Sequence, residues 1–263
     1  MPRRWTTTEE NKYRLELFSL YIEQNKSLRE VALALNITEA SVFSRLKRLG
    51  IKTCPTLKDN YLRKRKDLTI PTEYSADLAE FFGVMLGDGH LSHFQATVTL
   101  GNKEKNYAEH VSVLFQKVFG VAGTICVRKS LYRDVYLGSV EVTSWLFKEG
   151  LVSNKVKSQV NAPSWIFRES ILMENFLRGF FDTDGSVYKL KFGIQISFCN
   201  RSLPLLESLH LMLKKLKYHP SNISGFNFYL TRRKEVKRFF EEVRPANSKH
   251  VRRYFEIMNA SVG

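Results

Sequence analysis

The sequence has few cysteines, no long apolar run, and far fewer acidic than basic residues. Its three cysteines, Cys54, Cys126 and Cys199, are an odd number without CxxC or Cys/His finger spacing, which excludes a disulfide framework and a structural zinc module. No stretch of about 18 apolar residues occurs, and the segment MPRRWTTTEEN lacks the apolar core of a signal peptide. We therefore expect no membrane association and a cytosolic protein, nucleoid-associated in a prokaryote and not secreted.

The shortage of acidic residues gives the chain a strong positive charge. Lys and Arg number 41 against 26 Asp and Glu, which makes the formal net charge +15 over 263 residues. Residues 1–66 hold 15 basic and 7 acidic residues, so about a quarter of the chain has half of the excess. A charge of this size favours a polyanionic partner, and we expect double-stranded DNA.

Residues 1–53 have the pattern of three short helices. The pairs Thr7 and Glu10, then Ser27 and Glu30, have the spacing of a capping box, and Thr38 is placed to cap a third helix that Gly50 ends. The apolar positions of the three helices are Tyr13, Leu17, Leu20 and Tyr21, then Val31, Ala32 and Leu35, then Val42, Leu46 and Leu49. This order predicts a helix-turn-helix domain.

The third helix of this domain turns short polar and cationic groups outward. Side chains of these types contact base edges and phosphates in the major groove. The outward residues are Ser41, Ser44, Arg45, Lys47 and Arg48. The alternative is a three-helix packing module with an ordinary solvated face.

A linker is predicted over residues 54–75, which contain Pro55 and Pro71 and show little helical periodicity. Its basic run suits contact with phosphates, although such a run in a linker is also compatible with simple solvation. The run consists of Arg63, Lys64, Arg65 and Lys66.

The body of the chain is duplicated. Residues 81–89, FFGVMLGDG, correspond to residues 177–185, LRGFFDTDG, with a spacing of 96 residues between Asp88 and Asp184. In each copy an alternating strand follows, then Asn-Lys or Asn-Arg, then an amphipathic helix. The repeat predicts an α+β body of two half-domains, 76–162 and 163–263, each with a sheet that has one apolar and one polar face.

Two alternating strands define the polar faces. Phe94, Ala96, Val98 and Leu100 point to one side of the first strand, and Phe192, Ile194, Ile196 and Phe198 to one side of the second. Further short strands are predicted around residues 125–128, 135–137 and 226–231.

The repeated motif has small residues four apart on a helix. Gly83 and Gly87 have this spacing in the first copy, and Gly179 and Thr183 in the second. Two helices with such a stripe can pack backbone to backbone, which would bring Asp88 and Asp184 together at their C-terminal ends.

Paired carboxylates at the negative ends of two helix dipoles repel each other until a divalent cation binds. The ligands would be the carboxylates of Asp88 and Asp184 and the main-chain carbonyls of Gly87 and Thr183. Hard oxygen ligands favour Mg²⁺, with Mn²⁺ or Ca²⁺ able to substitute in binding. In a basic protein the matching chemistry is metal-assisted phosphodiester hydrolysis. The alternative is that Asp-Gly after each helix is a common C-terminal turn.

The two nine-residue segments resemble the paired signature of LAGLIDADG homing endonucleases in the single-chain form, over residues 76–258. The resemblance implies two αββαββα half-domains that form a saddle of two four-stranded sheets over the major groove, with Asp88 and Asp184 binding catalytic metals. It also implies cleavage of both strands at a long, weakly palindromic site, with Lys155 and Lys249 supporting catalysis. Leu86 departs from the family pattern, which usually has an acidic residue there. The helix-turn-helix domain lies outside this core.

Polar strand residues and basic strand ends are the predicted DNA contacts of the body. The alternative for the strand residues is an ordinary solvent-facing role. They are Gln95, Thr97, Thr99, Arg128, Lys129 and Arg133 in the first half, and Lys191, Gln195, Ser197, Arg232 and Arg233 in the second.

Three functions are compatible with this pattern. The first is a Mg²⁺-dependent, site-specific double-strand DNA endonuclease that acts as a monomer without an obligate protein partner. The second is a transcription regulator that binds DNA without cutting it, and the third is an RNA intron maturase. The retained acid pair argues against the regulator, which has no need of a repulsive pair of carboxylates.

Overall fold

The computed structural model describes residues 5–24, 26–51, 67–130, 132–191 and 193–259. Contacts divide the chain into two compact units, Met1–Arg63 and Lys64–Gly263. Within the described ranges, no helix combines the length and the apolar character that a membrane crossing requires. Seven residues that the sequence singled out lie outside the described ranges, namely Cys54, Pro55, Arg63, Lys64, Arg65, Lys66 and Phe192.

The N-terminal unit is helical, as the sequence predicts. Thr7–Phe18 (α1) continues into the π-helical segment Ser19–Glu23 (η1), and Leu28–Ala34 (α2) and Glu39–Arg48 (α3) follow. The sequence pattern gives no sign of the π-helical segment. The unit has a small core of its own, formed by Leu17, Tyr21, Val31, Ala32, Val42, Leu46 and Leu49.

Side-chain caps begin all three helices. Ser27 and Thr38 accept hydrogen bonds from the main-chain amides of Glu30 and Ser41, which confirms both predicted caps. The first capping box is Thr6 with Glu9, one residue earlier than predicted, because the sequence TTTEE offers the same spacing twice. Gly50 has a φ of 65° after α3, a left-handed conformation that glycine adopts without a Cβ clash.

The C-terminal unit consists of two halves that begin with the repeated motif. The first half is Ala76–Leu86 (α5), Gly89–Leu91 (β1), Gln95–Leu100 (β2), Lys105–Phe119 (α6), Thr124–Val127 (β3), Arg133–Gly138 (β4) and Val140–Lys148 (α7). A 3₁₀ helix, Ser164–Arg168 (η2), leads into the second half. That half is Ser170–Asp184 (α8), Gly185–Leu190 (β5), Gly193–Cys199 (β6), Leu203–Lys215 (α9), Asn227–Leu230 (β7), Arg233–Glu242 (α10) and Ser248–Asn259 (α11).

The first half has the predicted αββαββα order and a four-stranded antiparallel sheet, β1-β2-β4-β3. Ala96, Val98 and Leu100 of β2 are buried and alternate with half-buried polar residues. Phe94 does not continue this apolar face, since it precedes β2 and its side chain is 62% exposed.

The second sheet corrects the prediction of four strands. Its described part has three antiparallel strands, β5-β6-β7, so the half reads αββαβα with α11 added at the end. The segment before β7 runs beside it, but joins it regularly at one bridge only, Ser224 with Asn227. The main-chain amide of Ser221 bonds the carbonyl of Tyr229 (2.8 Å), but the amide of Tyr229 bonds the serine hydroxyl (3.0 Å) instead of the serine carbonyl, so the pair of main-chain bonds that a strand ladder needs is incomplete.

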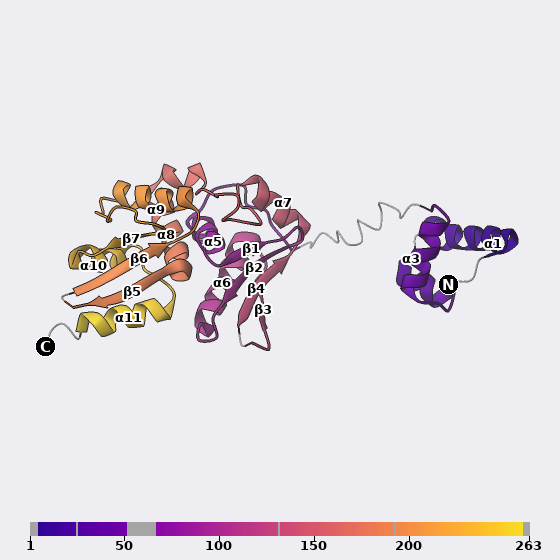
Figure 1. The fold of residues 1–263 in the computed structure, drawn as a ribbon, viewed down its shortest axis with the longest axis horizontal. Helices are drawn as coiled ribbons and strands as arrows, with labels where there is room; N and C mark the ends of the chain where they lie inside the picture. Colours follow the sequence, from indigo (N-terminus) through magenta and orange to yellow (C-terminus); the bar gives the residue numbers. More distant parts are fainter. Residues whose placement is uncertain (1–4, 25, 52–66, 131, 192, 260–263) are drawn as a thin grey trace. The chain divides into compact units, whose positions relative to one another are not determined.

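The helices α5 and α8 lie side by side between the two sheets, at the centre of the unit (Figure 1). Both are buried along most of their length and belong to one continuous core that includes both halves. The mixed helix and antiparallel sheet content confirms the predicted α+β class.

Candidate active site

Glycines allow the backbones of α5 and α8 to touch. A Cβ on Gly83 would lie 2.8 Å from the amide nitrogen of Phe180, and nearer still to the carbonyl oxygen of Phe176. A Cβ on Gly179 would lie 2.9 Å from the amide nitrogen of Val84. Real Cβ atoms do not approach backbone so closely, so the predicted backbone-to-backbone packing is confirmed.

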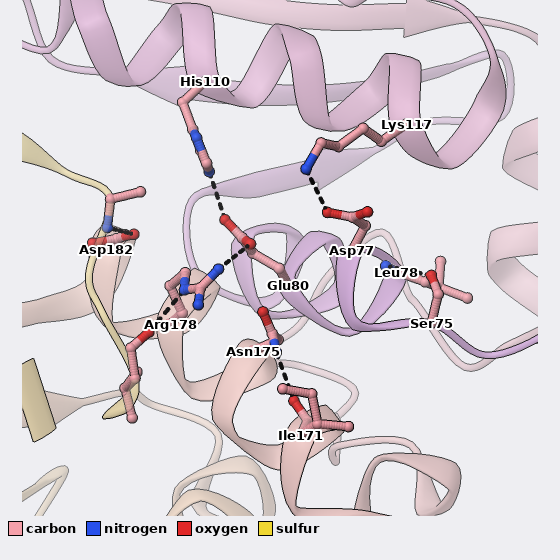
Figure 2. A network of polar contacts seen from close by, with 12 residues as sticks. Ser75, Asp77, Leu78, Glu80, His110, Lys117, Ile171, Asn175, Arg178 and Asp182 are labelled. Carbon is pink, nitrogen blue, oxygen red and sulfur yellow. Dashed lines mark hydrogen bonds and ion pairs between the residues drawn. The ribbon is translucent and has the colours of Figure 1, made fainter. Parts of the chain in front are cut away.

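A buried polar network links the middle of α5 to the middle of α8 (Figure 2). Glu80 of α5 is 2% exposed and accepts hydrogen bonds from His110 Nε2 of α6 (2.6 Å) and Arg178 Nη1 of α8 (3.2 Å). Arg178 also donates from Nε to the carbonyl oxygen of Val243 (2.8 Å). One buried carboxylate thus joins helices from both halves, and its two partners offset the cost of burying its charge.

Asp88 and Asp184 come together at the C-terminal ends of these helices. Burial raises the pKa of Asp88 to about 6, and the negative charge of Asp184 is the second cause. Burial also raises the pKa of Asp184, against the charge of Lys155 and a hydrogen bond from Asn200 Nδ2 to Asp184 Oδ2 (3.0 Å). The pair is electrostatically unfavourable in its ionised form, as a site awaiting a cation would be.

Lys155 lies beside the acid pair. Its Nζ donates hydrogen bonds to the main-chain carbonyls of Gly87 and Met85, the latter at 3.3 Å. Burial lowers the pKa of Lys155, and the charges of Asp184 and Asp88 oppose that effect. The ammonium group of Lys155 therefore bonds the carbonyl of Gly87, which the sequence predicts as a metal ligand.

Lys249 approaches the acid pair from the second half. Its Nζ pairs with Glu104 Oε1 (2.8 Å), and Asn247 Nδ2 donates to the same oxygen (2.7 Å). Burial alone would raise the pKa of Glu104, but the hydrogen bonds from Lys249 and Asn247 hold it below its ordinary value. Sequence reasoning missed Glu104, whose only signal is its position three residues after Gly101 at the start of α6.

Asp182, in the second motif, has a structural role that the sequence reasoning did not assign. It is fully buried and accepts hydrogen bonds from the main-chain amides of Ala246 (2.8 Å) and Asn247 (3.0 Å). Burial raises its pKa to about 7 even against these hydrogen bonds. Asp182 thereby holds the segment that carries Lys249, and Leu86 at the matching position of the first motif cannot do so.

The residues present fit a divalent cation. Within the described ranges, no three His, Cys, Asp or Glu side chains are grouped as metal ligands, so the protein offers the two carboxylates, while the predicted ligand carbonyl of Gly87 already accepts a hydrogen bond from Lys155. Mg²⁺ is often bound in this way, by one or two carboxylates with water and substrate phosphate oxygens completing the coordination. The hydroxyl of Thr183 donates to the carbonyls of Gly179 (3.1 Å) and Phe180 (2.9 Å) within α8, and the main-chain carbonyl of Thr183 stays the predicted ligand at this residue.

The polar sheet faces carry the predicted base contacts. Gln95, Thr97 and Thr99 are half-buried on the side of β2 away from the core, and Thr99 donates to Asp134 (2.8 Å). In the second half, Gln195 and Ser197 line a shallow cavity of about 310 Å³, but Ser197 is only 4% exposed, and Lys191 is exposed. Tyr188, Asn227 and Tyr229 share that cavity and were missed by the sequence reasoning.

The basic strand ends already have partners within the chain. Arg128 forms an ion pair with Asp134, and Arg133 donates to the carbonyl oxygen of Asn102. Arg232 pairs with Glu235 (3.3 Å), Arg233 donates to the carbonyl oxygen of Met258 (3.4 Å), and Lys129 is exposed. Contact with phosphate would have to compete with these interactions.

In the N-terminal unit, two arginines that are predicted to contact DNA stack on aromatic rings. Arg45 lies over the ring of Tyr13 (4.6 Å to the centroid) and Arg48 over the ring of Trp5 (4.2 Å). Ser44 is exposed, and Ser41 bonds Thr38 through its hydroxyl (2.9 Å). Stacking of this kind fixes the direction of a guanidinium group, which the sequence pattern alone does not reveal.

Comparison with known proteins supports the resemblance of the repeated motif. Residues 172–244 match the family described as LAGLIDADG-like domain. A curated relative, the replication factor C small subunit of Methanocaldococcus jannaschii, is 29% identical over 119 residues. These residues are 45% of this chain and 6% of that protein, so the chain spans only a small part of its length. The matched residues include the second motif and the strands β5, β6 and β7.

Solved structures with a similar course of the chain include I-DmoI in complex with DNA and Mn, with a TM-score of 0.46 and 13% identity over 64% of this chain and 96% of that one. The N-terminal LAGLIDADG domain of DUF199/WhiA has a TM-score of 0.46 and 16% identity, and the match covers 66% of this chain and 86% of that one. The homing endonuclease I-WcaI bound to its DNA recognition sequence has a TM-score of 0.44 and 16% identity, and the match covers 75% of this chain and 91% of that one.

Proposed function

We propose that this chain is a site-specific double-strand DNA endonuclease that requires a divalent cation, with Mg²⁺ as the natural one. The observation that carries the proposal is the meeting of Asp88 and Asp184, one from each motif, where α5 and α8 end. A protein that only binds DNA gains nothing from two half-buried carboxylates that repel each other and the phosphates. The net charge of +15 supports a polyanionic substrate.

In the proposed reaction, a cation held by Asp88 and Asp184 would supply Lewis-acid activation of a phosphodiester and lower the pKa of bound water. Lys155 and Lys249, one beside each motif, would neutralise charge that develops on the phosphate oxygens. Asn200 holds the carboxylate of Asp184 through Oδ2, and Glu104 and Asp182 hold Lys249 in position. The experiment is selection of bound duplexes from a randomised library, followed by incubation of the selected duplex with protein and Mg²⁺.

A single chain should suffice for both cuts. Because both motifs come from one polypeptide, the acid pair is complete without a second subunit, and we expect one protein molecule per DNA. The residues proposed to face the groove differ between the halves, so the selected site should be weakly palindromic. They are Gln95, Thr97 and Thr99 in one half and Lys191, Gln195 and Ser197 in the other. Sedimentation of the complex measures the stoichiometry. Two chains on a symmetric duplex would show that the active site forms between molecules.

The N-terminal unit is proposed to add affinity without taking part in cleavage. A shortened chain that starts at Asp67 keeps Thr69, whose amide bonds the carbonyl oxygen of Phe119 (2.9 Å), and should fold and cut. It should bind more weakly, and the slope of log K against log salt should fall by roughly 0.9 for each phosphate that the shortened chain leaves uncontacted. Titration of the selected duplex at several salt concentrations checks this. An unchanged slope would mean that neither the helical unit nor the basic run contacts phosphate.

A further inference from the structure

The last helix, α11, has one buried stripe that fixes its position along β5 (Figure 1). His250, Tyr254 and Ile257 recur at helical spacing and are buried. The ring of Tyr254 stacks on Phe240 with centroids 4.0 Å apart, and the ring of His250 lies 4.9 Å from that of Phe181. The helix is therefore anchored by core aromatics, and the faces beside its buried stripe have a fixed direction.

The neighbouring stripe of α11 borders an open cleft of about 670 Å³. One wall of this cleft is formed by Lys249, Arg252, Arg253 and Glu256. Asp184 lines the same cleft. The opposite wall includes Ser186, Tyr188 and Cys199, which the strand register places on the polar side of the sheet together with Gln195 and Ser197. The cleft thus connects Asp184 with the face of the sheet that is proposed to contact DNA.

The charge of this wall is positive and only loosely compensated. Arg252 Nε and Arg253 Nη1 share one carboxylate, Glu256, at 3.7 and 3.6 Å. The side chains of Arg252, Arg253 and Glu256 are 75%, 52% and 53% exposed. Ion pairs this long and this exposed are weak, so both guanidinium groups can exchange Glu256 for a stronger anionic partner.

We propose that α11 is a phosphate-binding wall, in which Arg252 and Arg253 contact the DNA backbone next to the phosphodiester that lies at Asp184. This inference rests on the proposed function and names a binding surface for its substrate. A continuous backbone fits better than a small anion, because the cleft is open and runs on to the sheet face. Two guanidinium groups on adjacent residues can engage successive phosphates of one strand.

The wall is one-sided within the described residues. In the first half, α7 is followed by turns over residues 153–159 and then by η2, and no helix stands where α11 stands in the second half. The wall therefore serves one DNA strand, near the second half-site. Its removal should affect phosphates on that strand and leave those at the first half-site unchanged.

The test uses the full chain and the duplex selected from the library, with Ca²⁺ present for binding. The double variant Arg252→Gln/Arg253→Gln should bind more weakly, with a salt slope smaller by roughly 0.9 to 1.8, the value for one or two phosphates no longer neutralised. Glu256→Gln removes the competing carboxylate and should bind more tightly than wild type. The matched control is Lys237→Gln on α10, whose ion pair with Glu241 is equally long at 3.6 Å but borders neither cleft.

Phosphate ethylation interference locates the bound phosphates. Wild type should show interference at one or two phosphates beside the cut made at Asp184, and the double variant should lack interference at these positions only. Identical slopes and identical interference patterns in wild type, the double variant and the control would overturn the inference while leaving the nuclease proposal intact. A changed slope in a protein that binds but never cuts would support the wall and contradict the nuclease. Failure of wild type to bind any duplex would contradict both.

Discussion

Replacing either acidic residue, as Asp88→Asn or Asp184→Asn, is expected to reduce double-strand cleavage by at least about 10³-fold. Each substitution removes a charged metal ligand, and a bound cation contributes several kcal/mol to stabilising the transition state, at about 1.4 kcal/mol per tenfold in rate. Cleavage of plasmid carrying the selected site measures the effect. Asp77→Asn is the matched control, since Asp77 is a carboxylate in the first turn of α5, at the opposite end from Asp88, and pairs with Lys117 (2.9 Å). Near-normal cutting by either motif variant contradicts the site.

The same substitutions should not weaken DNA binding, because they remove a negative charge that faces phosphate.

The two substitutions should also stabilise the fold in a pH-dependent way. The pKa of Asp88 in the folded protein is about 6, above the ordinary value of 3.8, so folding favours the protonated form. The resulting stability is present below pH 4 and is lost as pH rises through 6. Asp88→Asn should therefore raise Tm relative to wild type at pH 8 and have little effect at pH 4.

Alanine at Gly83 or Gly179 is expected to destabilise the C-terminal unit by about 1–3 kcal/mol or more, the usual cost of overpacking. In an exposed helix the same change would stabilise by about 1 kcal/mol. Here the added methyl groups would meet the backbone of the partner helix, at 2.8 Å from Phe180 N and 2.9 Å from Val84 N. Separation of α5 and α8 also separates Asp88 from Asp184, so cleavage should fall with stability.

Thermal unfolding and the cleavage assay together test this second expectation. Gly193→Ala is the control, because a Cβ at Gly193 meets nothing within 4 Å. A fall in Tm at both helix positions with no fall at Gly193 is the predicted pattern. Unchanged stability of Gly83→Ala and Gly179→Ala would show that the helix pair tolerates a wider spacing, and that the tight packing does not set the geometry of the site.

The parts of the fold that the sequence predicts are those with a local signal. Alternation over Ala96, Val98 and Leu100 indicated the buried face of β2, and caps at Ser27 and Thr38 indicated two helix starts. The duplicated motif indicated the pairing of α5 with α8, because two glycine-bearing helices in one chain have an obvious way to pack. The caps and the alternation depend on residues near one another in sequence, and the helix pairing follows from a repeat that the sequence itself displays.

Features that depend on individual side-chain contacts, with no repeat or periodicity in the sequence, were not predictable. The second sheet lacks a regular fourth strand in its described part because the Ser221 hydroxyl replaces a carbonyl, which no alternation pattern reveals. Glu104 and Lys249 lie far apart in the sequence and pair only because the halves meet. Asp182 belongs to the second motif, but its hydrogen bonds to the amides of Ala246 and Asn247, more than sixty residues along the chain, have no signal in the sequence.

Cleavage of the selected duplex under different cations tests the central claim most directly. With Mg²⁺, one protein molecule should convert supercoiled plasmid to linear product by cutting both strands. With Ca²⁺, the protein should remain bound to uncut DNA, and with EDTA it should not cut. The predicted result is metal-dependent linear product that requires both Asp88 and Asp184. Specific binding with no cleavage in Mg²⁺ or Mn²⁺ would contradict the account and identify the chain as a DNA-binding protein without nuclease activity.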